Sequence, residues 1–173
     1  MSTREITKKA LVVGIYVGLT FAFSFLAYGD IQFRIAEALV LIVFFKRNYA
    51  IPLILACLIA NLPSPLGIVD LVFGTAGTAL AVAGISLVSK HQKLFGHRWI
   101  ALLVASMMPV LANGFFVGLE LYLFLDLPFW FSAASVAFGE LVVVSAFGVP
   151  LFSALGRNKT FLHLIDADSP DSR

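Results

Sequence analysis

The sequence has 173 residues, of which 60% are hydrophobic and 13% are charged, and its formal net charge is +2 at pH 7. Since about 25% of the residues in a soluble domain are charged, the composition excludes an ordinary water-soluble fold. The small positive charge gives no support to nucleic-acid binding, and the lone Cys57 excludes an internal disulfide and a multi-cysteine metal site.

Six predicted transmembrane helices follow one another along the chain. Because about 20 apolar residues cross a bilayer, the apolar runs predict an all-α integral membrane protein, a bundle of six helices. The first run also has features of a secretory signal peptide, but it is long for one and lacks a small-x-small cleavage pattern. The predicted spans are residues 10–27, 33–45, 50–62, 71–88, 99–125 and 127–155.

The second and third runs are too short to cross the membrane as helices alone. Each rises only about 20 Å at about 1.5 Å per residue, against a hydrocarbon core of about 30 Å. Irregular backbone at Gly29, before the second run, and at residues 61–67, after the third, must complete these crossings. Broken segments of this kind point to a transporter binding site, and a tight connecting loop is the alternative interpretation.

Basic residues lie at the N-terminus, after the second and fourth spans, and in the C-terminal tail. The other connections hold none except Arg34, so the positive-inside rule places both termini in the cytoplasm of a plasma-membrane protein. We expect one transmembrane domain, residues 1–156, and a polar cytoplasmic tail, residues 157–173, without fixed structure. The basic residues are Arg4, Lys8, Lys9, Lys46, Arg47, Lys90, Lys93, Arg98, Arg157, Lys159 and Arg173.

Acidic residues have the opposite distribution and fall in the outer half or near the midplane of the predicted bundle. Glu140 lies about 17 Å along the last helix at about 1.5 Å per residue, close to the bilayer centre. A carboxylate at that depth costs several kcal/mol when unpaired and normally marks a substrate or ion path. An excess of acid over base favours a cationic or donor-rich ligand. The candidate charged residues are Asp30, Arg34, Glu37, Asp70, Glu120 and Glu140, with Arg34 alternatively a structural clamp.

Neutral side chains at similar depth complete the predicted substrate site. The amides of Gln32, Asn61 and Asn113 suit the edge of a heterocycle. Tyr122 and Trp130 have rings suited to stacking on a planar ligand, although aromatic residues at this level also serve as membrane-interface anchors.

Small residues repeat every four positions on the first predicted helix, at Ala10, Gly14 and Gly18. This stripe predicts close approach of another helix, which belongs either to the same bundle or to another membrane subunit. The sequence has no G-x-x-x-x-G-K-[ST] phosphate loop and no catalytic signature, so we expect no catalytic residues, no metal site and no resident cofactor.

Four segments resemble the QueT family, the substrate-binding (S) components of energy-coupling factor transporters assigned to queuosine precursors. They are residues 28–39 (YGDIQFRIAEAL), residues 61–74 (NLPSPLGIVDLVFG), residues 109–120 and residues 138–141 (FGEL). The resemblance extends from about Lys9 to Gly156.

The resemblance implies a six-helix S component with a high-affinity pocket near the outer side, capped by the loop after the first helix. It further implies a transmembrane coupling protein that contacts Ala10, Gly14 and Gly18, and two cytoplasmic ATPases that use ATP. The implied ligand is a deazapurine such as aminomethyl-deazaguanine. Two alternatives stay open: a stand-alone proton-coupled transporter of small organic cations with Glu37 or Glu140 as proton carrier, and an S component for another vitamin-like ligand.

Overall fold

The computed structural model describes residues 3–27 and 33–165, and within these ranges every regular element is a helix. This confirms the predicted all-α class. The elements are α1 (Thr3–Ala22), α2 (Ser24–Ala27), η1 (Ile35–Leu41), α3 (Ile42–Phe45), η2 (Arg47–Tyr49), α4 (Ala50–Asn61), α5 (Ile68–Lys90), η3 (Gln92–Phe95), α6 (Arg98–Leu125), α7 (Phe129–Glu140), η4 (Leu141–Gly148), α8 (Val149–Leu155) and α9 (Lys159–Leu164).

Three helical spans in the described ranges are long and apolar enough to cross a membrane. They are α5, α6 and the continuous run Phe129–Leu155, which joins α7, η4 and α8. Two shorter apolar segments, Ile35–Phe45 and Arg47–Asn61, coincide with the second and third predicted runs. The chain is therefore a multi-pass membrane protein, and its large exposed apolar side chains, such as Leu80, Leu111 and Phe147, suit contact with lipid.

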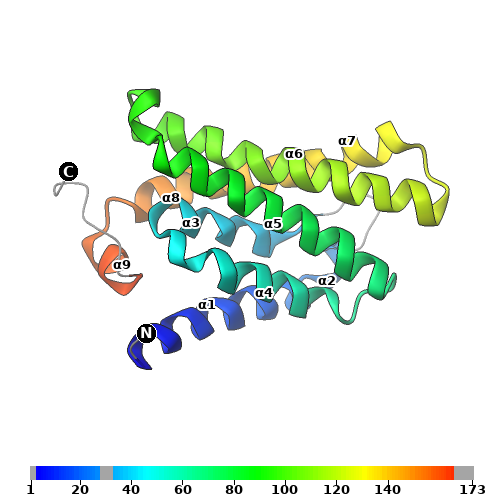
Figure 1. Ribbon diagram of the computed structural model, residues 1–173, viewed down its shortest axis with the longest axis horizontal. Helices are drawn as coiled ribbons and strands as arrows, with labels where there is room; N and C mark the ends of the chain where they lie inside the picture. Colours follow the sequence, from blue (N-terminus) through cyan, green and yellow to red (C-terminus); the bar gives the residue numbers. More distant parts are fainter. Residues whose placement is uncertain (1–2, 28–32, 166–173) are drawn as a thin grey trace.

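The helices run roughly along one common direction (Figure 1). Helices α5 and α6 are antiparallel neighbours, because Gly77 lies against Asn113 and Gly84 lies against Met108. Helix α1 packs beside α4, and the η1 segment packs against η4 in the interior. The apolar core lies between them and includes Val40, Leu41, Leu53, Ile85, Val144 and Phe152.

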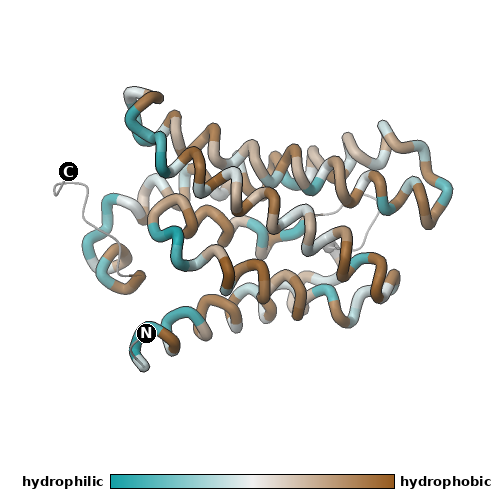
Figure 2. The backbone as a smooth tube through the Cα atoms, viewed as in Figure 1, coloured by the Kyte–Doolittle hydropathy of each residue, from teal (hydrophilic) through white to brown (hydrophobic). Residues whose placement is uncertain are grey.

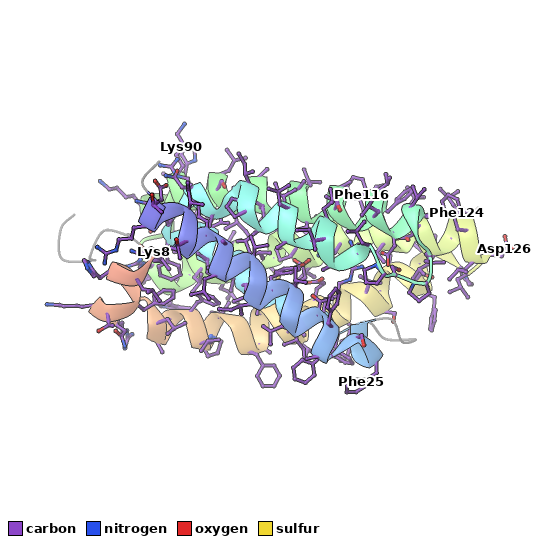
Figure 3. The ribbon with its side chains drawn as sticks, turned by 90° about the horizontal axis from the view of Figure 1, so that it is seen from below. Lys8, Phe25, Lys90, Phe116, Phe124 and Asp126 are labelled. Atoms are coloured by element: carbon purple, nitrogen blue, oxygen red, sulfur yellow. The ribbon has the colours of Figure 1, made fainter. Side chains whose placement is uncertain are left out.

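The two ends of the bundle differ in charge. Lys8 and Lys90 lie at one end, and Phe25 and Asp126 lie at the other (Figure 3). The start of α1 and the short α9 share the end that holds the lysines (Figure 1). Hydrophilic residues are concentrated at that end, whereas brown, hydrophobic residues cover most of the length of the long helices (Figure 2).

The second predicted helix is not a regular α-helix. Residues Ile35–Leu41 form a 3₁₀-helix that continues into the α3 turn. The last span likewise changes type, because Leu141–Gly148 is a π-helix between α7 and α8. Hydrophobicity reports burial along a helix but not its winding, so the sequence predicted helical structure in both segments and missed the 3₁₀ and π geometry.

The expectation that the C-terminal tail lacks fixed structure is wrong for its first part. The side chain of Asn158 caps α9 by accepting bonds from the backbone N–H groups of Thr160 (2.9 Å) and Phe161 (3.2 Å). Leu162 and Ile165 are buried, and the ring of Phe161 lies 6.2 Å from that of Phe45. An asparagine cap followed by apolar residues at helical spacing is the sequence signal for this helix.

Helices α6 and α7 approach closely at Gly118. A Cβ atom at this position would lie 2.7 Å from the Cα and 2.9 Å from the backbone nitrogen of Ala133. We predict that Gly118→Ala destabilises the protein by about 2 kcal/mol, because a backbone neighbour cannot rotate away. The melting temperature in detergent should fall by about 4–8 °C. Gly18→Ala is the matched control, since nothing lies within 4 Å of that position, and equal melting temperatures of the two variants would contradict the packing described here.

Candidate functional site

Polar side chains from six separate segments meet inside the bundle. Each is 8% exposed or less, and they come from η1 and the residue before it, α4, the connection after α4, α5, α6 and α7. Seven of them are residues that the sequence predicted. The buried polar group consists of Arg34, Glu37, Asn61, Ser64, Asp70, Thr78, Asn113, Glu120 and Glu140.

Glu37 and Glu140 belong to a central layer, which we define as Tyr16, Glu37, Thr78, Asn113 and Glu140. The Oε1 atom of Glu37 accepts hydrogen bonds from the hydroxyls of Tyr16 (2.5 Å) and Thr78 (2.9 Å). The Oε1 atom of Glu140 accepts one from the amide Nδ2 of Asn113 (2.8 Å). Neutral donors thus hold one oxygen of each carboxylate and fix the direction of the other.

A second, loop-side layer adjoins the connection between α4 and α5 and consists of Arg34, Asn61, Ser64, Asp70 and Glu120. The guanidinium of Arg34 forms a buried ion pair with Asp70, with 3.1 Å between Nη2 and Oδ1. Ser64 donates a hydrogen bond to the other carboxylate oxygen of Asp70, and Asn61 donates to the backbone carbonyl of Asp70 (3.3 Å). These bonds tie the irregular 61–67 connection to the start of α5, so buried polar side chains hold this non-helical backbone in place.

Packing between α5 and α6 sets the spacing of the two layers. A Cβ atom on Gly77 would lie 2.5 Å from Oδ1 of Asn113, so glycine is required where that amide crosses to α5. Asp70 precedes Gly77 by seven residues, and Glu120 follows Asn113 by seven. Because seven residues make about two helical turns, the antiparallel helices carry Asp70 and Glu120 to one common level, about 10 Å from Asn113.

The central carboxylates lie on unusual backbone. Glu37 is in the first turn of the 3₁₀ segment, and Glu140 is the last residue of α7 before the π segment. Both helix types are associated with functional positions, since they redirect side chains relative to a regular α-helix. The η1 and η4 segments also pack against each other. Irregular winding therefore occurs at both acidic side chains of the central layer.

Several buried polar atoms have no hydrogen-bond partner among the described residues. Most are acceptors: Oε2 of Glu37, Oε2 of Glu140, Oδ1 of Asn113 and both carboxylate oxygens of Glu120. The Nη1 atom of Arg34 is an unpaired donor of the same group. Because an unsatisfied buried polar group costs about 1–3 kcal/mol, such a concentration of acceptors favours a binding site for a ligand rich in donors.

The net charge of the buried polar group also favours a ligand rich in hydrogen-bond donors. Four carboxylates are buried here, while Arg34 is the one basic side chain buried with them in the described ranges. Arg34 pairs with Asp70, and Glu37, Glu120 and Glu140 have no basic partner among the described residues. A cation or several N–H donors would relieve this excess.

Two pockets lie at the opposite, basic end of the bundle. One, of about 270 Å³, is lined by residues that include Phe45, Arg98, Trp99 and Phe152. The other, of about 400 Å³, is lined by residues that include Arg4, Glu5, Lys9 and Lys46. Neither is lined by a predicted substrate-binding residue, so the outer pocket implied by the family resemblance stays a prediction.

Two predicted site residues, Tyr122 and Trp130, lie outside the buried group, and two more fall outside the described residues. Tyr122 is 50% exposed and Trp130 is 81% exposed, and their rings contact Phe129 at centroid distances of 6.4 and 5.0 Å. Asp30 and Gln32 lie outside the described residues. The structure therefore brings together the predicted amides and carboxylates of the described ranges, and leaves the two aromatic residues on the surface.

Tyr16, Ser64 and Thr78 were not predicted as site residues. Tyr16 is the buried residue of α1 and is the one polar ring on the face that packs inward. Thr78 lies in the middle of α5, one residue after Gly77. A hydroxyl at the predicted depth of Glu37 was the available signal, because buried carboxylates require donors.

The small-residue stripe on α1 faces away from the bundle. Ala10, Gly14 and Gly18 are exposed, and a Cβ atom at Gly14 or Gly18 would have no neighbour within 4 Å among the described residues. Tyr16, on the opposite face of α1, is buried. Packing within the bundle, one of the two interpretations of the stripe, is therefore wrong.

Comparison with known proteins gives two matches. A family model described as "QueT transporter" matches residues 6–157. A curated protein described as "Queuosine precursor transporter QueT", from Lactococcus lactis subsp. cremoris (strain MG1363), is 29% identical over 144 residues, which cover 80% of this chain and 84% of that protein. No solved structure gives a significant match.

Proposed function

Since the chain belongs to the QueT transporter family, we propose that it is the substrate-binding subunit of an energy-coupling factor importer for a queuosine precursor. The observation that carries this proposal is the buried group of acidic side chains with unpaired acceptor oxygens. Aminomethyl-deazaguanine has a primary ammonium and several guanine-like N–H donors, so it matches both the charge and the acceptors of the group.

In the proposed topology the chain crosses the plasma membrane six times. The spans are α1 with α2, the two shorter apolar segments, α5, α6 and the run from α7 to α8. The basic end of the bundle faces the cytoplasm together with both termini, as the positive-inside rule requires. The two acidic layers then lie between the midplane and the outer surface, where substrate arrives.

We propose that the exposed stripe on α1 contacts a transmembrane coupling protein, which associates with two cytoplasmic ATPases. A flat surface of small residues allows the backbone of a partner helix to approach closely. Hydrolysis of ATP by the partners then drives inward release of the substrate.

A bulky side chain on the stripe should separate binding from transport. We predict that Gly14→Leu leaves substrate affinity unchanged within about twofold, because Gly14 is exposed on the face of α1 opposite Tyr16, and abolishes ATP-driven uptake by the assembled importer. Ala83→Leu is the control, since Ala83 is an exposed small residue on α5. Normal uptake by Gly14→Leu would show that the coupling protein docks elsewhere.

Calorimetric titration of the purified protein with aminomethyl-deazaguanine tests the proposed substrate. Saturable one-to-one binding supports the proposal, and absence of binding excludes this ligand and favours another vitamin-like one. Uptake by the lone protein in vesicles under a proton gradient would instead identify the stand-alone proton-coupled transporter, with Glu37 or Glu140 as the proton carrier.

A further inference from the structure

The unpaired acceptors of the two layers differ in kind. In the central layer each carboxylate keeps one oxygen bonded to neutral donors and presents a single unpaired oxygen. Glu120, in the loop-side layer, is fully buried and has no hydrogen-bond partner for either oxygen among the described residues. The two layers therefore offer different partners to a ligand.

We propose that Glu120 binds the cationic group of the substrate, while Glu37, Asn113 and Glu140 accept hydrogen bonds from the neutral N–H edge of its ring. This assignment rests on the proposed function. It makes Glu120 the residue that selects an ammonium-bearing substrate over an uncharged analogue of the same ring.

The chemistry of each layer supports the assignment. An ammonium carries three donors and a full charge, and it is best paired with a carboxylate whose two oxygens are both available. The central layer presents three single acceptors, on Glu37, Asn113 and Glu140, which suit the separate N–H groups along the edge of a planar heterocycle. Neutral donors already serve the other oxygens of its carboxylates.

Arg34, the basic side chain of the loop-side layer, does not pair with Glu120 in place of the ligand. Arg34 directs Nη2 to Asp70 at 3.1 Å, and its Nη1 atom lies toward Gly74, where a Cβ atom would be 3.3 Å away. Asp70 is already bonded by Arg34 and Ser64. Glu120 is therefore the carboxylate of this layer that is free to pair with an incoming cation.

The spacing of the two layers also fits the size of the proposed ligand. Asn113 and Glu120 are separated by two turns of α6, about 10 Å along the helix axis. With side chains extending from both levels toward the ligand, this distance accommodates a small two-ring compound that has N–H donors at one end and an ammonium at the other.

Two probes that differ in one group test the assignment: aminomethyl-deazaguanine and the same deazaguanine with a neutral nitrile in place of the aminomethyl group. We expect Glu120→Gln to weaken binding of the aminomethyl probe by about 10- to 100-fold, as for loss of a charged hydrogen bond, and to change binding of the nitrile probe by less than threefold. Glu140→Gln should weaken both probes by a similar factor.

Equal losses for both probes in Glu120→Gln, or no loss for either, would overturn the assignment. If Glu120→Gln does not fold, the affinities of the wild-type protein for the two probes provide the test. Equal affinity for both probes would also overturn the assignment. A wild-type protein that binds neither probe refutes the proposed function itself, which is a different outcome from either of these.

Discussion

Asp70→Asn should lower the free energy of unfolding by about 3 kcal/mol, because it leaves the buried guanidinium of Arg34 without its ion-pair partner. Removing one member of a buried pair typically costs about 3–5 kcal/mol, and we expect the lower figure since Glu120 lies at the same level. The substitution also weakens the bond from Ser64 that anchors the 61–67 connection. The melting temperature in detergent should fall by about 6–12 °C.

The double variant Arg34→Gln with Asp70→Asn distinguishes charge from packing. Because it removes both charges, it should be more stable than Asp70→Asn alone. A melting temperature of Asp70→Asn equal to that of the wild type would show that the ion pair does not hold the loop-side layer together.

Glu140→Gln should weaken substrate binding without weakening the fold. The amide keeps the shape of the side chain and can still accept from Asn113 through its oxygen. Its NH₂ group cannot accept a bond from the ligand, so we expect a loss of about 2 kcal/mol in binding free energy, or about 30-fold in affinity. The melting temperature of the empty protein should stay equal or rise, because a neutral amide costs less free energy to bury than a carboxylate.

Asp126→Asn is the matched control for this substitution. Asp126 is an exposed acidic residue after the end of α6, with a φ of 55° that asparagine also adopts readily. It should bind substrate like the wild type in the same calorimetric titration. Wild-type affinity in both Glu140→Gln and Glu37→Gln would contradict the binding role of the central layer.

The carboxylates and amides of the site could be predicted from the sequence because the free-energy cost of burying such groups depends on their depth in the membrane alone. A carboxylate within an apolar run, such as Glu37, Glu120 or Glu140, is expensive wherever the helix faces. Asn61 and Asp70 flank the proline-containing connection, and the same argument about irregular backbone applies to them. The structure gathers all five in one buried group.

Other features of the site depend on tertiary contacts that no local pattern encodes. Tyr16 and Thr78 donate to Glu37 from helices far away in the sequence. The pairing of Asn113 with Gly77 depends on the register of two packed helices. Aromatic residues were ambiguous for a further reason: Tyr122 and Trp130 have the same amphipathic character whether they stack on a ligand or face the membrane interface.

The number of spans illustrates the same limit. Helices α5 and α6 and the run from α7 to α8 are long enough to be recognised by length and hydropathy. The second and third apolar segments are not, because the 3₁₀ segment of Ile35–Leu41 and the 61–67 connection replace part of the regular helix. In the proposed six-span topology, short irregular crossings are stable only when the rest of the bundle covers their backbone, and this cover is a property of the folded chain.

The small molecule that copurifies with the wild-type protein can be identified by mass spectrometry. We expect a basic, donor-rich heterocycle such as aminomethyl-deazaguanine, present in wild-type protein and depleted in Glu140→Gln. An anionic or purely apolar compound, retained equally by both proteins, would contradict the claim that the buried carboxylates bind the substrate.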